Sequence, residues 1–196
     1  MRKSQSTKQI ILEHATNKAS MVGLKGLSIG SLASDLNLSK SGLFGHFGSK
    51  EELQIEVLNT ASQQYTLEVV QPALREERGE VRLRALFENW LHWAKAQNTE
   101  RQGCIFVATS IELDDERGPV RDKLVELQSA WIYILEKTVD LGRQSNSFKQ
   151  AIQPELAAQE VYGVMLSFHL YYRLLEDQAS EVRTRLLFEG ILSRLI

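Results

Sequence analysis

The sequence predicts an all-α protein of about nine helices. Apolar residues recur at the three- and four-residue spacing of amphipathic helices along most of the 196 residues. No run alternates with the period of two that a half-buried strand requires. Serine caps, glycine stops and three prolines, all beyond position 70, divide the chain into separate helices.

Three short helices are expected within the first 50 residues, at about 6–22, 28–36 and 39–46. The GLKG segment at 23–26 stops the first helix, and Ser28 is a suitable N-cap for the second. Asn37 tolerates the left-handed conformation that ends a helix, and Ser39 caps the third. A turn of about three residues therefore joins the second and third helices, which is the spacing of a helix-turn-helix.

Longer helices are expected in the remainder of the chain. Ser49 and Glu52 form a capping box at the start of a helix over about 49–74. Pro119 and Pro154 suit the first turns of two others. The expected ranges after residue 74 are about 81–97, 104–113, 119–141, 154–175 and 180–196.

The net charge of −2 conceals an uneven distribution. Residues 1–50 carry seven basic and two acidic residues, a balance of +5, whereas residues 51–196 carry 16 basic and 23 acidic residues, a balance of −7. A basic N-terminal part on an acidic body favours contact between that part and a polyanion. Chance variation of charge along the chain is the alternative.

Several classes of protein are disfavoured. No apolar run approaches the ~20 residues that span a bilayer, and the N-terminus lacks the features of a signal peptide, so a cytoplasmic protein without a membrane partner is expected. Cys104 is the one cysteine, and it is interpreted as a buried apolar residue, with a redox or ligand contact as the alternative. No phosphate-binding loop, nucleophile motif or metal-ligand spacing is found, so we expect no enzyme activity, no cofactor and no metal site.

The segment SKSGLFGHFGSKEEL, from Ser39 to Leu53, contains the expected second helix of the helix-turn-helix. Such a helix lies in the DNA major groove with its N-terminal residues nearest the bases. Gly42 lets the backbone approach the duplex, and Phe44 is expected to contribute more to packing than to a base contact. Side chains or backbone N–H groups could reach phosphates from the flanks. The candidate DNA-binding residues are Ser28, Ser39, Lys40, Ser41, Gly42, Phe44, His46 and Lys50.

The run LSIGSLASDLNLSKSGLFGHFGSKEEL, with TKQIILEHA at 7–15, resembles the DNA-binding region of the TetR family of bacterial transcriptional regulators. Gly42, Gly45 and Gly48 depart from residues usual in that family. The resemblance covers about residues 7–57. It implies a DNA-binding domain at 1–50, a ligand-binding and dimerisation domain at 51–196, and a ligand-responsive repressor that binds a palindromic double-stranded operator as a homodimer.

Aromatic residues are distributed over several of the expected body helices. Aromatic stripes at helical spacing usually form core, but the resemblance implies that this region encloses a pocket for a small-molecule effector of unknown identity. The candidate ligand-binding residues are Trp90, Trp93, Phe106, Trp131, Phe168 and Tyr172.

The last two expected helices carry apolar residues on more than one face, so each must be covered from several sides. The resemblance implies that a second subunit covers them in a four-helix dimer bundle, and other helices of the same chain are the alternative. The candidate interface residues are Met165, Leu186, Leu187, Gly190 and Ile191.

The acidic run ELDDER at 112–117 is interpreted as a solvated turn in preference to a cation site. Two other functions remain open: a helical enzyme or ligand carrier with an inert N-terminal part, and a protein-interaction adaptor. Binding to a palindromic operator in a gel shift, set against a screen for turnover, separates a regulator from an enzyme.

Overall fold

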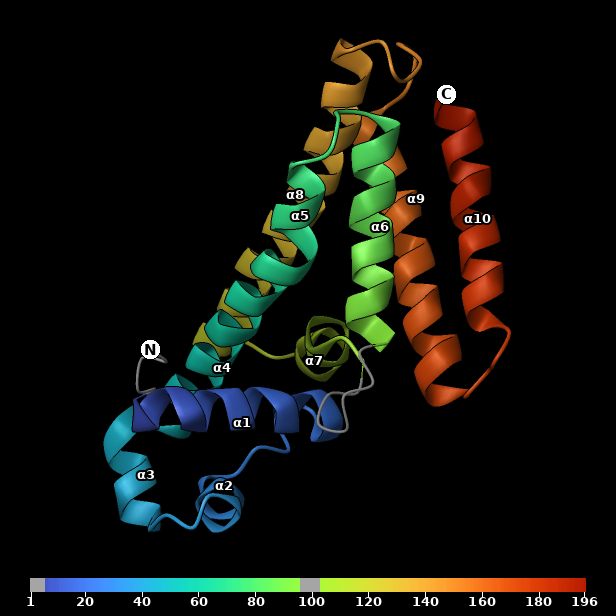
Figure 1. Ribbon diagram of the computed structural model, residues 1–196. Coiled ribbons are helices and arrows are strands. Elements are labelled where there is room, and N and C mark those ends of the chain that lie inside the picture. The colour runs from blue at the N-terminus through green and yellow to red at the C-terminus, as the bar shows by residue number, and fades with distance from the viewer. Residues whose placement is uncertain (1–5, 96–102) are drawn as a thin grey trace, which may run out of the picture. The chain divides into compact units, whose positions relative to one another are not determined.

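The computed structural model describes residues 6–95 and 103–196, and every regular element within them is helical (Figure 1). The elements are α1 (Thr7–Val22), α2 (Ile29–Asp35), α3 (Lys40–Phe47), α4 (Lys50–Tyr65), η1 (Thr66–Val70), α5 (Gln71–Leu74), α6 (Glu80–Lys95), α7 (Ile105–Leu113), α8 (Pro119–Gln144), α9 (Pro154–His169), η2 (Leu170–Leu174) and α10 (Ser180–Leu195). The predicted all-α class is confirmed, and the elements correspond in order to the nine expected ranges. In this part of the chain no helix combines the length and the apolar composition that crossing a membrane requires.

The chain forms two compact units. The first contains the described residues of Met1–Gln64 and Ala96–Glu126, and the second contains Tyr65–Lys95 and Leu127–Ile196. The first unit therefore includes most of α4 and all of α7 beside the three short helices. The predicted functional division at residue 50 remains a prediction, because contact between helices does not say which residues bind DNA.

In the first unit α1, α2 and α3 surround a small apolar core (Figure 1). Ile11 of α1, Leu32 of α2, and Leu43 and Phe47 of α3 are all buried. Asn37 has a φ of 53°, as its left-handed role predicts, and the N–H of Leu38 donates to the carbonyl of Ala33 at 2.8 Å. These contacts fix the turn between α2 and α3.

The helix predicted over 49–74 is interrupted by η1, a π-helical segment. Pro72 has no N–H, and its ring would collide with the carbonyl four residues earlier in a regular α-helix. The backbone widens before it, and the N–H of Gln71 donates to the carbonyl of Thr66, five residues back. The side chain of Asn89 on α6 donates to the carbonyl of Val69 at 3.0 Å, which satisfies a group within the irregular segment.

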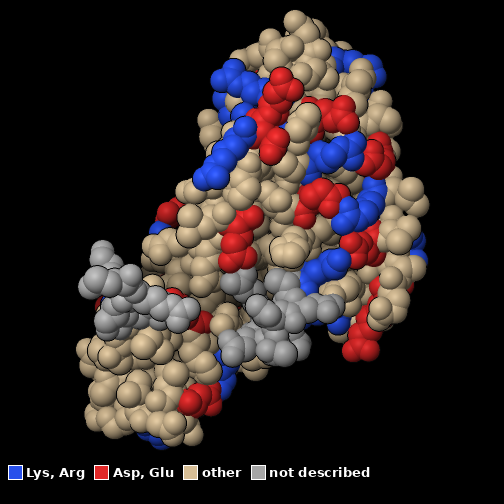
Figure 2. All heavy atoms as spheres, in the orientation of Figure 1, with Lys and Arg blue, Asp and Glu red and all other residues tan. Residues whose placement is uncertain are grey.

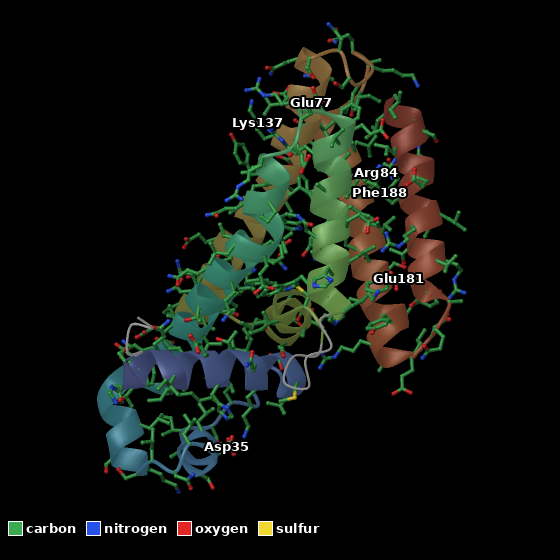
Figure 3. The ribbon with its side chains drawn as sticks, in the orientation of Figure 1. Asp35, Glu77, Arg84, Lys137, Glu181 and Phe188 are labelled. Atoms are coloured by element: carbon green, nitrogen blue, oxygen red, sulfur yellow. The ribbon has the colours of Figure 1, made fainter. Side chains whose placement is uncertain are left out.

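In the second unit α10 packs along α9, and an apolar contact with flanking ion pairs joins α10 to α6. The rings of Phe87 and Phe188 are stacked with centroids 3.9 Å apart. Arg84 of α6 pairs with Glu189 of α10, and Arg185 of α10 pairs with Glu88 of α6. Arg84 and Phe188 lie at similar levels on the two helices (Figure 3), and Figure 2 shows basic and acidic side chains interleaved along this face.

One backbone approach in the second unit requires glycine. A Cβ built on Gly142 of α8 would lie 2.2 Å from the ring of Phe148 and 3.0 Å from the Cα of Gly79. Phe148 is buried, and its N–H and that of Ser147 both donate to the carbonyl of Gly142. The end of α8 is thus packed too closely for any side chain at position 142.

Gly142→Ala should therefore destabilise the protein, by roughly 1–3 kcal/mol, because the new methyl group displaces a buried ring. Gly45→Ala is the matched control: Gly45 is also helical, but its added Cβ meets nothing within 4 Å. The control should gain about 0.5–1 kcal/mol from helix propensity alone. Urea unfolding of both variants measures the difference, and equal stabilities would contradict the described packing at Gly142.

Candidate nucleic-acid interface and effector region

The helix α3 has one buried edge and is otherwise exposed. Leu43 and Phe47, four residues apart, are the buried residues among its eight. The remaining positions face solvent, and they include every residue of α3 that the sequence marked for DNA: Lys40, Ser41, Gly42, Phe44 and His46. An amphipathic helix normally shows charged side chains on its outer face. Here that face carries one lysine, and its other members include glycine, serine, histidine and an aromatic ring.

Both helices of the motif begin with serine caps. The Ser28 hydroxyl accepts the N–H of Ser31 at 3.1 Å, and the Ser39 hydroxyl accepts the N–H of Gly42 at 3.0 Å. The hydroxyl of Ser41 lies 3.3 Å from that of Ser39. These bonds leave the starts of α2 and α3 exposed with their geometry fixed.

Phe44 lies outside the core. Its side chain is 48% exposed, although the sequence suggested that it would contribute mainly to packing. The reason is geometric: Leu43 and Phe47 define the inner edge, and position 44 lies one residue, about 100°, around the helix from Leu43. Gly42 and Gly45, on either side of Phe44 in the helix, have no side chains, so the ring stands out from the backbone around it.

Three lysines among residues 6–50 are held by carboxylates. Lys8 pairs with Glu56 at 2.7 Å, Lys18 with Asp35 at 2.5 Å, and Lys25 with Glu116 at 2.7 Å. The ammonium of Lys18, followed by the hydrogen bond from His14, lowers the pKa of the Asp35 carboxyl below its usual value. Asp35 projects from α2 (Figure 3), so its contacts with Lys18 and His14 tie α2 to α1.

Lys40 and Lys50 are differently placed. The end of the Lys40 side chain passes over Gly30, where an added Cβ would lie 3.2 Å from its Cε. Lys50 donates to the backbone carbonyl of Lys25 at 2.9 Å. Within residues 6–95 and 103–196 no carboxylate pairs with either ammonium group. Their positive charges are therefore available to an external anion.

In the second unit, the structure brings together several of the aromatic residues predicted to bind a ligand. Phe168 stacks on Tyr172 at 5.0 Å between ring centroids and meets Trp90 edge-on at 6.0 Å. Trp93 and Trp131 each meet Tyr65 edge-on, at 5.3 and 5.1 Å. Phe106 is buried on α7 in the first unit. Tyr65, which contacts the rings of Trp93 and Trp131, was not among the candidate ligand-binding residues of the sequence analysis. The available signal was its place four residues after Ala61, on the apolar face of its helix.

Two polar groups belong to these residues or to a neighbour in sequence, Trp131 and His169. The indole Nε1 of Trp131 is buried and has no hydrogen-bond acceptor among the described residues. Burial, and then the positive charge of Arg173, lower the pKa of His169 to about 4, so its imidazole is neutral at pH 7. The buried indole N–H of Trp131 is therefore a donor without an acceptor in the part of the chain that the structure describes.

The residues predicted for a dimer interface fall into two groups. Leu186 and Leu187 of α10 are 66% and 54% exposed, and Gly190 is partly exposed. Met165 and Ile191 are buried inside the protomer, on two helices, α9 and α10, that pack against each other. Beside the exposed leucines lies an open hollow of about 440 Å³, lined by Tyr171, Arg183 and Thr184 among others.

Known proteins share this architecture. Residues 79–188 match the family model described as tetracyclin repressor-like, C-terminal domain. A TetR transcriptional regulator from Chloroflexus aurantiacus J-10-FL aligns with 19% identity over 98% of this chain and 96% of its own, with a TM-score of 0.83. A TetR-family regulator from Cytophaga hutchinsonii aligns with 20% identity over 98% of both chains, with a TM-score of 0.82.

A structure of AibR with isovaleryl coenzyme A and operator DNA aligns with 18% identity over 97% of this chain and 98% of its own, with a TM-score of 0.74. No curated protein shows significant sequence similarity to the chain. The structural likenesses establish the fold, whereas the family model covers more than half of the sequence. The helix-turn-helix, the helical body and this match together make the chain a member of the TetR family of transcriptional regulators.

Proposed function

We propose that the protein is a ligand-responsive repressor that binds a palindromic DNA operator as a homodimer in the cytoplasm. The observation that carries this proposal is the exposed face of α3, on which Ser41, Phe44 and His46 all face solvent. A short helix with so much exposed surface is available to a binding partner, and a helix in this position of a helix-turn-helix lies in the DNA major groove.

The proposed contacts follow the order of residues along α3. Ser39, Lys40, Ser41 and Gly42 begin the helix and are proposed to meet base edges, with Phe44 beside them. His46 and Lys50 follow and are proposed to meet phosphates, together with the backbone N–H groups at Ser28. Selection of bound sequences from a random DNA pool tests this function, and a palindromic consensus is the expected result.

Binding should depend strongly on salt. Lys40 and Lys50 are the lysines of the first unit with no carboxylate partner among the described residues, so two or three phosphates per subunit are expected to be neutralised. For a dimer, log K should then fall against log salt with a slope of roughly −4 to −5. Fluorescence anisotropy with the selected operator measures the slope. An affinity that does not change between about 50 and 200 mM salt would contradict the proposed phosphate contacts.

Phe44 should recognise thymine methyl groups, because its exposed ring has no polar atom and can make only apolar contacts in the groove. Replacing contacted thymines in the operator by deoxyuridine should weaken binding about fourfold for each methyl group lost. In Phe44→Ala this sensitivity should disappear.

Lys50→Ala is the control for Phe44→Ala, since a phosphate contact carries no sequence information. It should weaken binding to all DNA sequences and keep the sensitivity to deoxyuridine. Equal sensitivity in Phe44→Ala and the unchanged protein would exclude the proposed role of Phe44.

An effector is proposed to bind among the aromatic residues of the second unit. Trp90, Trp93, Trp131, Phe168 and Tyr172 supply apolar surface, and the buried Nε1–H of Trp131 favours a ligand with a carbonyl or carboxylate oxygen. AibR combines operator DNA and a coenzyme A thioester in one complex, which supports control by a ligand in this fold. Phe106 stays a prediction of the sequence. Quenching of tryptophan fluorescence in a compound screen, followed by release from DNA, identifies the effector.

The dimer is proposed to form through the exposed surface of α9, η2 and α10. Leucines project from this surface with no covering element in the described chain: Leu166, Leu170, Leu174, Leu186 and Leu187. The adjoining hollow of about 440 Å³ could receive a side chain of the partner. Met165, Gly190 and Ile191 would support the surface from within the α9–α10 pair.

Leu187→Glu should dissociate the dimer. Burial of a leucine side chain stabilises an interface by about 1.5–3 kcal/mol, and a two-fold interface contains each residue twice. The substitution also places two negative charges in the buried contact. Sedimentation should show monomers, and operator affinity should fall. Leu67→Glu is the matched control, since Leu67 is 61% exposed on η1. A folded dimer with unchanged DNA affinity for Leu187→Glu would place the interface elsewhere.

A further inference from the structure

The turn between α1 and α2 is held by a carboxylate from α7. Glu112, in the last turn of α7, accepts the backbone N–H of Leu24 at 2.8 Å and that of Lys25 at 3.3 Å through the same oxygen. The three residues belong to the first compact unit, in which α7 lies against α1 (Figure 1). Hydrogen bonds from backbone N–H groups to a carboxylate are stronger than neutral ones.

Gly23 makes room for this carboxylate. Its φ is +79°, and a Cβ built on it would lie 1.7 Å from the Oε1 atom of Glu112. A side chain at position 23 would therefore exclude the carboxylate as well as strain the backbone. The glycine ends α1 by donating its N–H to Ala19, and the next two N–H groups bind Glu112.

The other side of the same turn is held by α4. The side chain of Gln54 donates to the carbonyl of Leu24 at 3.0 Å, and Lys50 donates to the carbonyl of Lys25 at 2.9 Å. The N–H groups of the turn are thus bound by α7 and its carbonyls by α4. Leu24 itself is fully buried, so the turn is fixed by its backbone and by one apolar side chain.

The acidic run at 112–117, expected to be a solvated turn, has a different role at two of its positions. Glu112 binds the backbone of the turn, and Glu116 pairs with Lys25 at 2.7 Å. Residues 114–117 are exposed outside the helix, as a solvated turn requires. The expectation is wrong at Glu112, because a carboxylate that binds backbone N–H groups 88 residues earlier in the chain leaves no local pattern in the sequence.

We infer that Glu112 is the positioning residue through which α7 controls the placement of the helix-turn-helix. The inference rests on the proposed function. The turn leads directly into Ser28 and α2, and α2 packs on α3, so a shift of the turn displaces the helix that reads DNA. Phe106, which the sequence predicts to contact the effector, lies six residues before Glu112 on the same helix, about 9 Å along its axis.

Reciprocity allows a test without a known effector. If α7 and the helices proposed to read DNA are coupled, the coupling free energy is the same in both directions. A change in α7 that alters DNA affinity therefore implies that DNA binding alters α7. The selected operator should therefore change the hydrogen exchange of the amides of Ile105–Leu113 in the unchanged dimer. Without DNA, Glu112→Ala should also speed exchange of the Leu24 and Lys25 amides about tenfold or more, the loss expected for bonds to a charged group.

Three variants of the full chain separate positioning from general stability. In Glu112→Ala the response of α7 to the operator should be lost, while affinity for non-specific DNA, which depends on charge, should stay within about twofold. Glu112→Gln keeps an oxygen that can accept both N–H groups and should retain part of the response. Glu116→Gln removes only the exposed pair with Lys25 and should behave as the unchanged protein.

The outcomes are distinguishable. An operator response of α7 that persists in Glu112→Ala, or that is absent from the unchanged dimer, would overturn the inference and leave the proposed function intact. Equal losses in Glu112→Ala and Glu116→Gln would likewise overturn it. Failure to select any DNA would overturn the proposed function, and this inference with it.

Discussion

The first unit depends on the burial of two side chains beneath an eight-residue helix. A helix as short as α3 is not stable alone in water, so its existence requires tertiary contacts. Leu43 and Phe47 supply them, and Ser39 supplies the cap. Because these contacts use one edge of the helix, the residues on the opposite face are not required for packing. Stability is thereby assigned to one side of this short element, and the recognition proposed for it to the other.

The same separation appears in the turn before α2. Its polar backbone groups are bound by side chains from α4 and α7, so the position of the motif is set by helices that follow it in sequence. If the helix-turn-helix were held only by its own core, its position would not respond to changes in other helices. Here two side chains on α4 and one on α7 connect it to the remainder of the first unit. This arrangement suits a protein whose DNA affinity is to be controlled.

The second unit combines rigid and irregular parts. Stacked rings and reciprocal ion pairs join α6 to α10, whereas η1 and η2 interrupt the regular bonding of the helices that contain them. Pro72 explains the first interruption, and Asn89 stabilises it. Exposed ion pairs contribute little individually, so the stacked phenylalanines are expected to provide most of the attachment between α6 and α10.

The sequence by itself determined the helices, their order and the helix-turn-helix, because caps, stops and apolar spacing are local signals that act within a few residues. It also indicated that Ser41, Phe44 and His46 belong to one short helix. Only the tertiary structure decided that Phe44 projects into solvent, that Met165 and Ile191 lie inside the protomer, and that Pro72 is accommodated by a π-helical segment. The binding of Glu112 to the turn at Leu24 was likewise beyond the sequence, since a carboxylate gives no local indication of a backbone partner 88 residues away.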